Sequence, residues 1–184
     1  MRTPSTALRS SMAAAINIED PSRSKRFRLH LCAMKDASAA AKSLIETLAL
    51  APHPEGGWYR ETWRAAAAPG LRAAGTAILF LLEAGQTSHW HRVDASELWI
   101  YQAGAPLELS RASGSVVETL RLGPAVSHGE TLQAVIAPGQ WQRARASWGW
   151  SLVACVVVPG FEFSGFELAP EGWSPEVWSP EAST

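Results

Sequence analysis

Apolar residues that follow the first 37 positions recur initially with the period of a helix. Between residues 38 and 50 they fall at i, i+3, i+4 and i+7, at Ala41, Leu44, Ile45 and Leu48. This spacing gathers them on one face and predicts a helix from Ser38 to Leu50, with Ser38 as its N-cap. Pro52 and Pro54 come next, and because proline cannot continue a helix, the helix ends before them.

From about position 55 onward the pattern changes to that of short strands. Segments rich in β-branched and aromatic residues alternate with glycine and proline. We predict strands at Trp58–Trp63, Thr76–Leu82, Ser88–His91, Glu97–Gln102, Leu107–Ser110, Val116–Leu120, Gln133–Ile136, Trp141–Ala144, Ser151–Val158 and Phe161–Leu168. Regular spacing of this kind is typical of an all-β sandwich or closed barrel. The helical content between the strands is too small for a parallel α/β sheet.

Length and pattern together indicate one folded domain. The chain has 184 residues, of which 47% are hydrophobic, and this is enough for one sizeable core. We assign residues 1–35 to an extended or disordered N-terminal segment, residues 36–170 to the barrel, and residues 171–184 to a C-terminal tail containing Pro and Trp. The tail repeats Trp-Ser-Pro-Glu, and we expect Trp173 or Trp178 to pack on the barrel or on a second subunit.

Charge and cysteine usage narrow the classes of partner and compartment. The formal net charge is −1, and the part after Met34 is mildly acidic, so it lacks the clustered basic face of a nucleic-acid-binding protein. No run approaches the roughly 18 apolar residues of a membrane-spanning helix. Cys155 lies in an apolar run, where a buried reduced thiol indicates a reducing compartment, and we expect a cytoplasmic protein. The alternative is an organelle transit peptide in the Arg- and Ser-rich start.

The stretch SHWHRVDASE carries the strongest candidate chemistry. Residues i and i+2 of a strand face the same way, so we expect His89 and His91 to project together, with Glu97 arriving from the next strand. Two imidazoles and a carboxylate form a set that a divalent transition metal accepts. Trp99 and Tyr101 share the face of Glu97, which predicts one cavity lined by ligands and by an aromatic wall.

These residues resemble the first signature of the cupin superfamily, which has a glycine, a His-x-His pair, a glutamate and a second glycine. The matching positions are Gly85, His89, His91, Glu97 and Gly104. The spacings before His89 and after His91 differ from the usual ones. The second signature reads roughly Pro-x-Gly-x-x-His, and here Gly139 matches its glycine while Gln142 replaces its histidine.

Four longer segments, in order, resemble the cupin family DUF985, also called cupin 5. They are HPEGGWYRETWR (53–64), TAILFLLEAGQTSHWHRVDASELWIYQAG (76–104), GETLQAVIAPGQWQRA (129–144) and VVPGFEFSGFELA (157–169). This resemblance covers nearly all of residues 40–170. It implies a double-stranded β-helix, or jelly-roll, barrel with an internal pocket, usually in a homodimer. It implies no particular reaction, because the family largely lacks an assigned one.

Two interpretations of the polar cluster remain open. In the first, His89, His91, Glu97 and Gln142 hold one divalent transition metal such as Mn, Fe, Ni or Zn. In the second, the same residues form a metal-free pocket and hydrogen-bond to one another and to a ligand. Gln142 bears on the choice, because its amide oxygen is a weaker ligand than imidazole. The sequence indicates no organic cofactor.

Further ligand-binding candidates come from HPEGGWYRETWR, in which Arg60 and Tyr59 face opposite sides of the predicted strand. An inward Arg60 suits a carboxylate or phosphate on the ligand, whereas an outward one is a solvated partner of a nearby glutamate. The family resemblance favours the inward orientation. Together with Tyr59, Trp99 and Gln142, Arg60 would then bind a small anionic or sugar-like ligand. His53 adjoins a turn, and we assign it no catalytic role.

Three functions are compatible with these residues. The preferred one is an isomerase or epimerase acting on a carbohydrate or nucleotide sugar, with His91 or Glu97 as base and Tyr101 or Tyr59 as acid. The second is a metal-dependent oxygenase or lyase, which requires an ion at His89, His91 and Glu97. The third is a non-catalytic ligand-binding barrel, which the replaced ligand histidine favours.

Overall fold

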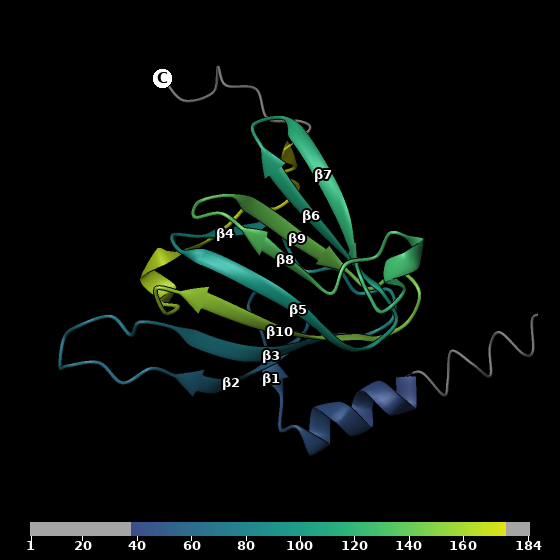
Figure 1. Cartoon of the computed structure of the whole chain (residues 1–184), viewed down its shortest axis with the longest axis horizontal. Coiled ribbons are helices and arrows are strands. Elements are labelled where there is room, and N and C mark those ends of the chain that lie inside the picture. The colour runs from purple at the N-terminus through teal and green to yellow at the C-terminus, as the bar shows by residue number, and fades with distance from the viewer. Residues whose placement is uncertain (1–37, 176–184) are drawn as a thin grey trace, which may run out of the picture.

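The computed structural model describes residues 38–175 and shows one helix beside a β barrel (Figure 1). Residues 38–47 are helical, and a turn at Ala49, whose φ is 49°, ends the helix three residues earlier than predicted. No helix in this part of the chain is long and apolar enough to cross a membrane. The predicted N-terminal segment and Trp178 lie outside the described residues.

Across residues 38–175 the paired strands form two antiparallel sheets (Figure 1). The six-stranded sheet runs in the order β1 (Ala51–Pro52), β2 (Trp58–Arg64), β3 (Thr76–Leu82), β10 (Ser151–Val158), β5 (Ser96–Gly104) and β8 (Gln133–Ile136). The five-stranded sheet runs in the order β11 (Phe166–Leu168), β4 (His91–Val93), β9 (Trp141–Arg145), β6 (Leu107–Ser113) and β7 (Val116–Leu122). Two single-turn 3-10 helices, η1 (Val126–His128) and η2 (Phe163–Gly165), lie in the connections.

The main core lies between the two sheets. Phe80, Trp99 and Val153 of the six-stranded sheet pack in one buried cluster with Leu109 and Leu122 of the other sheet. These residues alternate with more exposed ones along their strands, as expected where one face of each sheet is buried. The architecture is therefore the all-β double-stranded β-helix that the sequence predicts.

Most predicted strands are present, but two of them differ from the prediction in position or extent. Strands β3, β8 and β10 have the predicted ends. The predicted strand Ser88–His91 is wrong in position, because residues 88–90 have no strand structure and β4 begins only at His91. The predicted strand Phe161–Leu168 is wrong in its first half, because residues 163–165 form η2 and only the last three residues pair with β4.

The outer face of the six-stranded sheet is apolar along most of its length. The helix covers one end, where Ala41 and Leu50 pack on Leu81 and Leu152. Beyond the helix, a row of cross-strand neighbours continues the apolar face through Val135, Leu98, Val156 and Ala77. Val135, at one end of this row, is 53% exposed.

The far end of the described chain packs on the five-stranded sheet. The ring of Trp173 lies 4.5 Å from that of Trp141 and 6.2 Å from that of Trp90, measured between ring centroids. The beginning of the predicted tail therefore lies against the barrel.

A tight turn between β1 and β2 brings two polar residues to the barrel. The N–H of His53 donates to the carbonyl of Gly57 (3.0 Å), and the N–H of Gly56 donates to the carbonyl of His53 (2.9 Å). Gly57 has a φ of 75°, and a β-carbon there would lie 2.6 Å from Leu82 Cδ2 and 2.8 Å from the Leu81 carbonyl oxygen. The turn therefore needs glycine both for its conformation and for close approach to β3.

We expect Gly57→Ala to lower the free energy of unfolding by at least about 3 kcal/mol, since it adds a steric clash to the cost of a left-handed backbone. Gly70→Ala is the matched control, because Gly70 has a similar φ of 79° but open space around its Cα. It should cost only about 1 kcal/mol. Urea denaturation measures both, and equal losses in the two variants would contradict the close approach.

Candidate functional site

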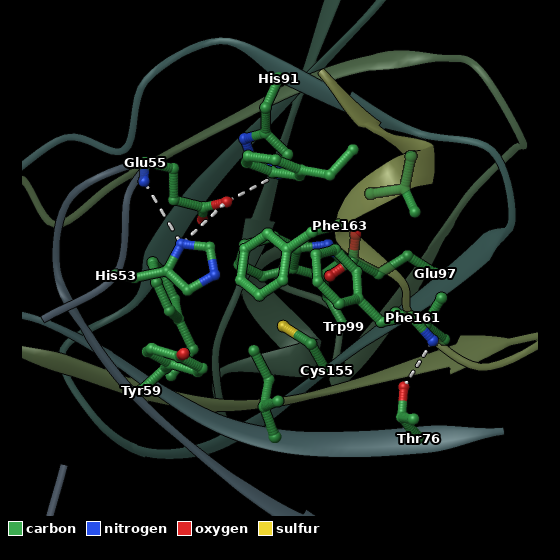
Figure 2. A pocket seen from close by; sticks show the side chains of 15 residues that line it. His53, Glu55, Tyr59, Thr76, His91, Glu97, Trp99, Cys155, Phe161 and Phe163 are labelled. Carbon is green, nitrogen blue, oxygen red and sulfur yellow. Dashed lines mark hydrogen bonds and ion pairs between the residues drawn. The ribbon is translucent and has the colours of Figure 1, made fainter. Parts of the chain in front are cut away.

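A small cavity opens inside the barrel, between the two sheets and beside η2 (Figure 2). Its volume is about 60 Å³. Fifteen side chains from both sheets and their connections line it: His53, Glu55, Tyr59, Thr76, Ile78, Phe80, His91, Val93, Glu97, Trp99, Cys155, Val157, Phe161, Phe163 and Phe166. Figure 2 shows His53, Glu55 and His91 on one side of the cavity and Glu97 on the other.

The hydrogen bonds of His91 define which of its ring nitrogens carries the proton. Its side chain is only 2% exposed, and Nδ1 lies 2.9 Å from the carbonyl oxygen of His89. A carbonyl can only accept, so Nδ1 is the protonated nitrogen and Nε2 presents its lone pair. Nε2 lies 3.2 Å from Oε2 of Glu55, where a protonated carboxyl can donate to it.

Glu55 and the two histidines beside it are held in their uncharged forms. Burial, followed by the charge of Glu97, raises the pKa of Glu55 well above its usual value. Burial also lowers the pKa of His53 and that of His91 to about 4. Both shifts favour a neutral hydrogen-bonded pair of Glu55 and His91 over an ion pair. His53 Nδ1 accepts the backbone N–H of Glu55 (3.3 Å), so its proton is on Nε2.

A chain of two hydrogen bonds, which starts at Trp99, holds Glu97 in place. The indole N–H of Trp99 donates to Oε1 of Gln142 (2.9 Å), which turns the amide of Gln142 so that Nε2 donates to Glu97 (2.5 Å). Burial raises the pKa of Glu97 to about 7, while hydrogen bonds from Gln142 and Cys155 act in the opposite direction. Glu97 therefore gains and loses its proton near neutral pH.

The two carboxyls differ in protonation within one small cavity. Glu97 is ionised above about pH 7 and can accept a proton, whereas the raised pKa of Glu55 favours its protonated form, which can donate one. A pair of titratable groups whose environments separate their pKa values is the usual arrangement for general acid and base catalysis.

The structure brings together five of the eight predicted site residues. Tyr59, His91, Glu97 and Trp99 line the cavity, and Gln142 lies directly behind Glu97 and Trp99.

The other three predicted residues lie elsewhere. His89 lies before β4 begins, and its Nε2 is hydrogen-bonded to the carbonyl of Ala169 (2.8 Å). Tyr101 lies on the inward face of β5 but near the end of the strand, where its hydroxyl donates to the carbonyl of Gly104 (2.7 Å). Arg60 is exposed, and it lies on the outer face of the sheet, where its cross-strand neighbour on β3 is Leu79.

Sequence reasoning missed His53 and Glu55, which are both central to the cavity. The available signal was a His-x-Glu pair directly before Gly56-Gly57. The two glycines mark a close turn, and a polar residue fixed by such a turn is a stronger candidate than one in an open loop.

The structure does not bring the four predicted metal ligands together around one point. The imidazole of His89 binds Ala169 and does not line the cavity, and both ends of the Gln142 amide are already hydrogen-bonded. Within residues 38–175, no group of three or more His, Cys, Asp or Glu side chains is arranged to hold an ion. The donor geometry therefore fits hydrogen bonding and proton transfer better than metal ligation.

A jelly-roll barrel with buried polar groups converging inside it defines a cupin-type protein, and this fold suggests small-molecule binding. The chain belongs to the Cupin_5 family of the cupin superfamily (DUF985), which matches residues 42–169. This confirms the resemblance seen in the sequence.

Two solved structures are similar to this chain at the level of sequence and fold. A hypothetical protein from Leishmania major is 33% identical, with a TM-score of 0.65, and the match covers 70% of this chain and 86% of that one. A protein from Shewanella oneidensis is 37% identical, with a TM-score of 0.66, and the match covers 69% of this chain and 82% of that one. The comparison with curated proteins gives no match.

We expect Glu97→Gln to become more stable relative to the wild type as pH rises from about 4.5 to 7. The raised pKa of Glu97 means that its favourable contribution is complete below the unfolded-state pKa of 4.5 and is lost as pH rises through about 7. The difference in unfolding free energy should shift by roughly 3 kcal/mol over this range. Urea denaturation at several pH values measures it, and a pH-independent difference would contradict the raised pKa.

Proposed function

We propose that the cavity is the active site of an isomerase or epimerase that moves a proton at a carbon next to a carbonyl group, without a metal ion. The observation that carries this proposal is the pair of buried carboxyls with different protonation states, Glu55 and Glu97. Both line one cavity that also holds two neutral imidazoles. The cupin family supplies the barrel, whereas the reaction is inferred from these side chains.

Glu97 is the base in the proposed reaction. Its carboxylate removes a proton from the carbon next to the carbonyl, and the electron pair of the C–H bond forms the carbon–carbon double bond of an enol. Glu55 donates its proton to the carbonyl oxygen at the same time. Return of the enol O–H proton to Glu55 re-forms the carbonyl group. In an epimerisation the hydroxyl of Tyr59, which also lines the cavity, protonates the carbon on its other face while Glu97 keeps the proton it removed. In an isomerisation of a carbonyl compound with a neighbouring carbon–carbon double bond, Glu97 returns its proton to the far carbon of that bond.

The histidines assist this transfer by holding positions and hydrogen bonds. In the free protein His91, fixed by the carbonyl of His89, accepts the proton of Glu55 and so holds the carboxyl in place; on ligand binding this hydrogen bond is exchanged for one to the carbonyl oxygen of the ligand. His53 carries its remaining N–H on Nε2 of a ring that lines the cavity, where it can stabilise the developing negative charge on oxygen. His91 is thus a positioning residue in this proposal and not the base, and the hydroxyl of Tyr101 has no part.

We expect Glu55→Gln and Glu97→Gln each to lower proton exchange by at least about a hundredfold, since each removes one partner of a general acid–base pair. Deuterium uptake from D₂O into small ketones and aldehydes, followed by proton NMR, measures the exchange. Glu118→Gln is the matched control, because Glu118 pairs with Arg111 on the surface of β7, and it should retain the wild-type rate.

Two results would favour the other functions. Loss of activity on treatment with a chelator, restored by Mn²⁺ or Fe²⁺, would support a metal-dependent oxygenase or lyase. Tight binding of a small molecule, with no exchange in the wild type for any carbonyl compound tested, would support a non-catalytic ligand-binding barrel.

We also propose that the protein is a homodimer that pairs through the outer face of the six-stranded sheet. Val135 is 53% exposed, and it continues a row of apolar neighbours through Leu98, Val156 and Ala77. A contiguous apolar sheet face is a common site of subunit contact. A symmetric dimer would bury the same row on both subunits.

Val135→Lys should shift the protein from dimer to monomer in sedimentation velocity experiments, because a charge would be buried at the subunit contact. Val116→Lys is the matched control, since Val116 is 70% exposed on β7 of the other sheet. It should leave the dimer intact. A monomeric wild type, or an unchanged dimer in Val135→Lys, would refute this interface.

A further inference from the structure

We infer that the cavity takes a small, uncharged carbonyl compound with an apolar body, in contrast to the anionic or sugar-like ligand that the sequence suggests. This inference rests on the proposed function only for the carbonyl group. The preference for an uncharged, apolar body comes from the walls of the cavity and can be tested by binding alone.

Much of the cavity wall is hydrocarbon, and it begins next to the imidazoles, since the ring centroid of Phe166 lies 5.6 Å from that of His91 and 6.0 Å from that of His53. Phe161, Phe163 and Phe166 form a cap from η2 and its flanks, with ring centroids between 5.1 and 6.2 Å apart. Figure 2 shows Phe163 lying across the cavity in front of Trp99. Phe163 is 59% exposed although it lines the cavity, so its ring lies at the boundary with solvent. A ligand that entered would contact aromatic faces along most of its length.

Among residues 38–175, no lysine or arginine side chain lines the cavity. Two arginines that reach the backbone beside the cap are already paired: Arg64 with Glu61 and with the carbonyl of Phe161, and Arg72 with Asp94 and with the carbonyl of Gly160. An anionic ligand would therefore give up its hydration beside the Glu55 and Glu97 carboxyls without gaining a cation. This excludes carboxylates and phosphates as good ligands.

The cavity also offers few hydrogen bonds to a ligand with several hydroxyl groups. Thr76 Oγ1 accepts the backbone N–H of Phe161 (2.9 Å), and the thiol of Cys155 is engaged with Glu97. The remaining polar side chains in the lining are His53, Glu55, Tyr59, His91 and Glu97. They suit one carbonyl or hydroxyl group, whereas each further hydroxyl of a sugar would lose its water partners at an apolar wall.

The size of the cavity supports the same class of ligand. A volume of about 60 Å³ holds a few water molecules or a compact small molecule. A nucleotide sugar is many times larger and would require the phenylalanine cap to move aside.

The test compares three small probes of similar size in binding titrations followed by protein NMR. They are cyclopentanone, which is apolar and uncharged, dihydroxyacetone, which is uncharged but sugar-like, and pyruvate, which is anionic. We expect cyclopentanone to bind at least about tenfold more tightly than dihydroxyacetone and about a hundredfold more tightly than pyruvate. Phe163→Ala should weaken cyclopentanone binding about tenfold, whereas Leu71→Ala, at a site 70% exposed, should not change it.

The outcomes separate this inference from the proposed reaction. Tighter binding of pyruvate or dihydroxyacetone than of cyclopentanone, or no detectable binding of cyclopentanone, overturns the ligand class even if proton exchange is found. The expected order of binding without exchange for any carbonyl compound supports the ligand class and overturns the proposed reaction.

Discussion

The burial of two carboxyl groups in one apolar cavity is the constraint on which the rest of the site depends. Each carboxyl loses most of its hydration, and two negative charges so close together would repel one another. The pKa of Glu55 is therefore raised well above its usual value, and Glu97 ionises only near pH 7. The hydrogen bonds of His91 and Gln142 are consistent with these two states.

The hydrogen-bond partners show how the fold maintains this difference. His91 presents a lone pair to Glu55 because its other nitrogen is tied to the backbone. Gln142 presents its N–H to Glu97 because Trp99, which can only donate, occupies its oxygen. In the segment that resembles the second cupin signature, Gln142 stands at the position of the signature's histidine. A glutamine in place of a histidine at this position is therefore consistent with a site held together by hydrogen bonds between side chains.

The sequence predicts correctly which side chains face the interior of the barrel where the prediction depends on alternation along a single strand. Alternation along β5 places Glu97 and Trp99 on the inward face, and both line the cavity. Tyr101 shares that face, but it lies farther along the strand, where its hydroxyl reaches Gly104 and not the cavity. Alternation gives the face of a side chain and not its depth in the barrel. It also fails at His89, because the chain there is not yet paired as a strand.

The sequence alone determined the fold class, the family, most strand positions and the inward placement of Glu97, because these follow from local periodicity and from motifs read in order. Only the tertiary structure decided that His53 and Glu55 join His91, that Gln142 supports Glu97, and that Arg60 lies on the outer face. Those facts depend on which strands meet and on which face of the sheet closes the barrel. Contacts between residues far apart in the chain arise from packing, and no local pattern encodes them.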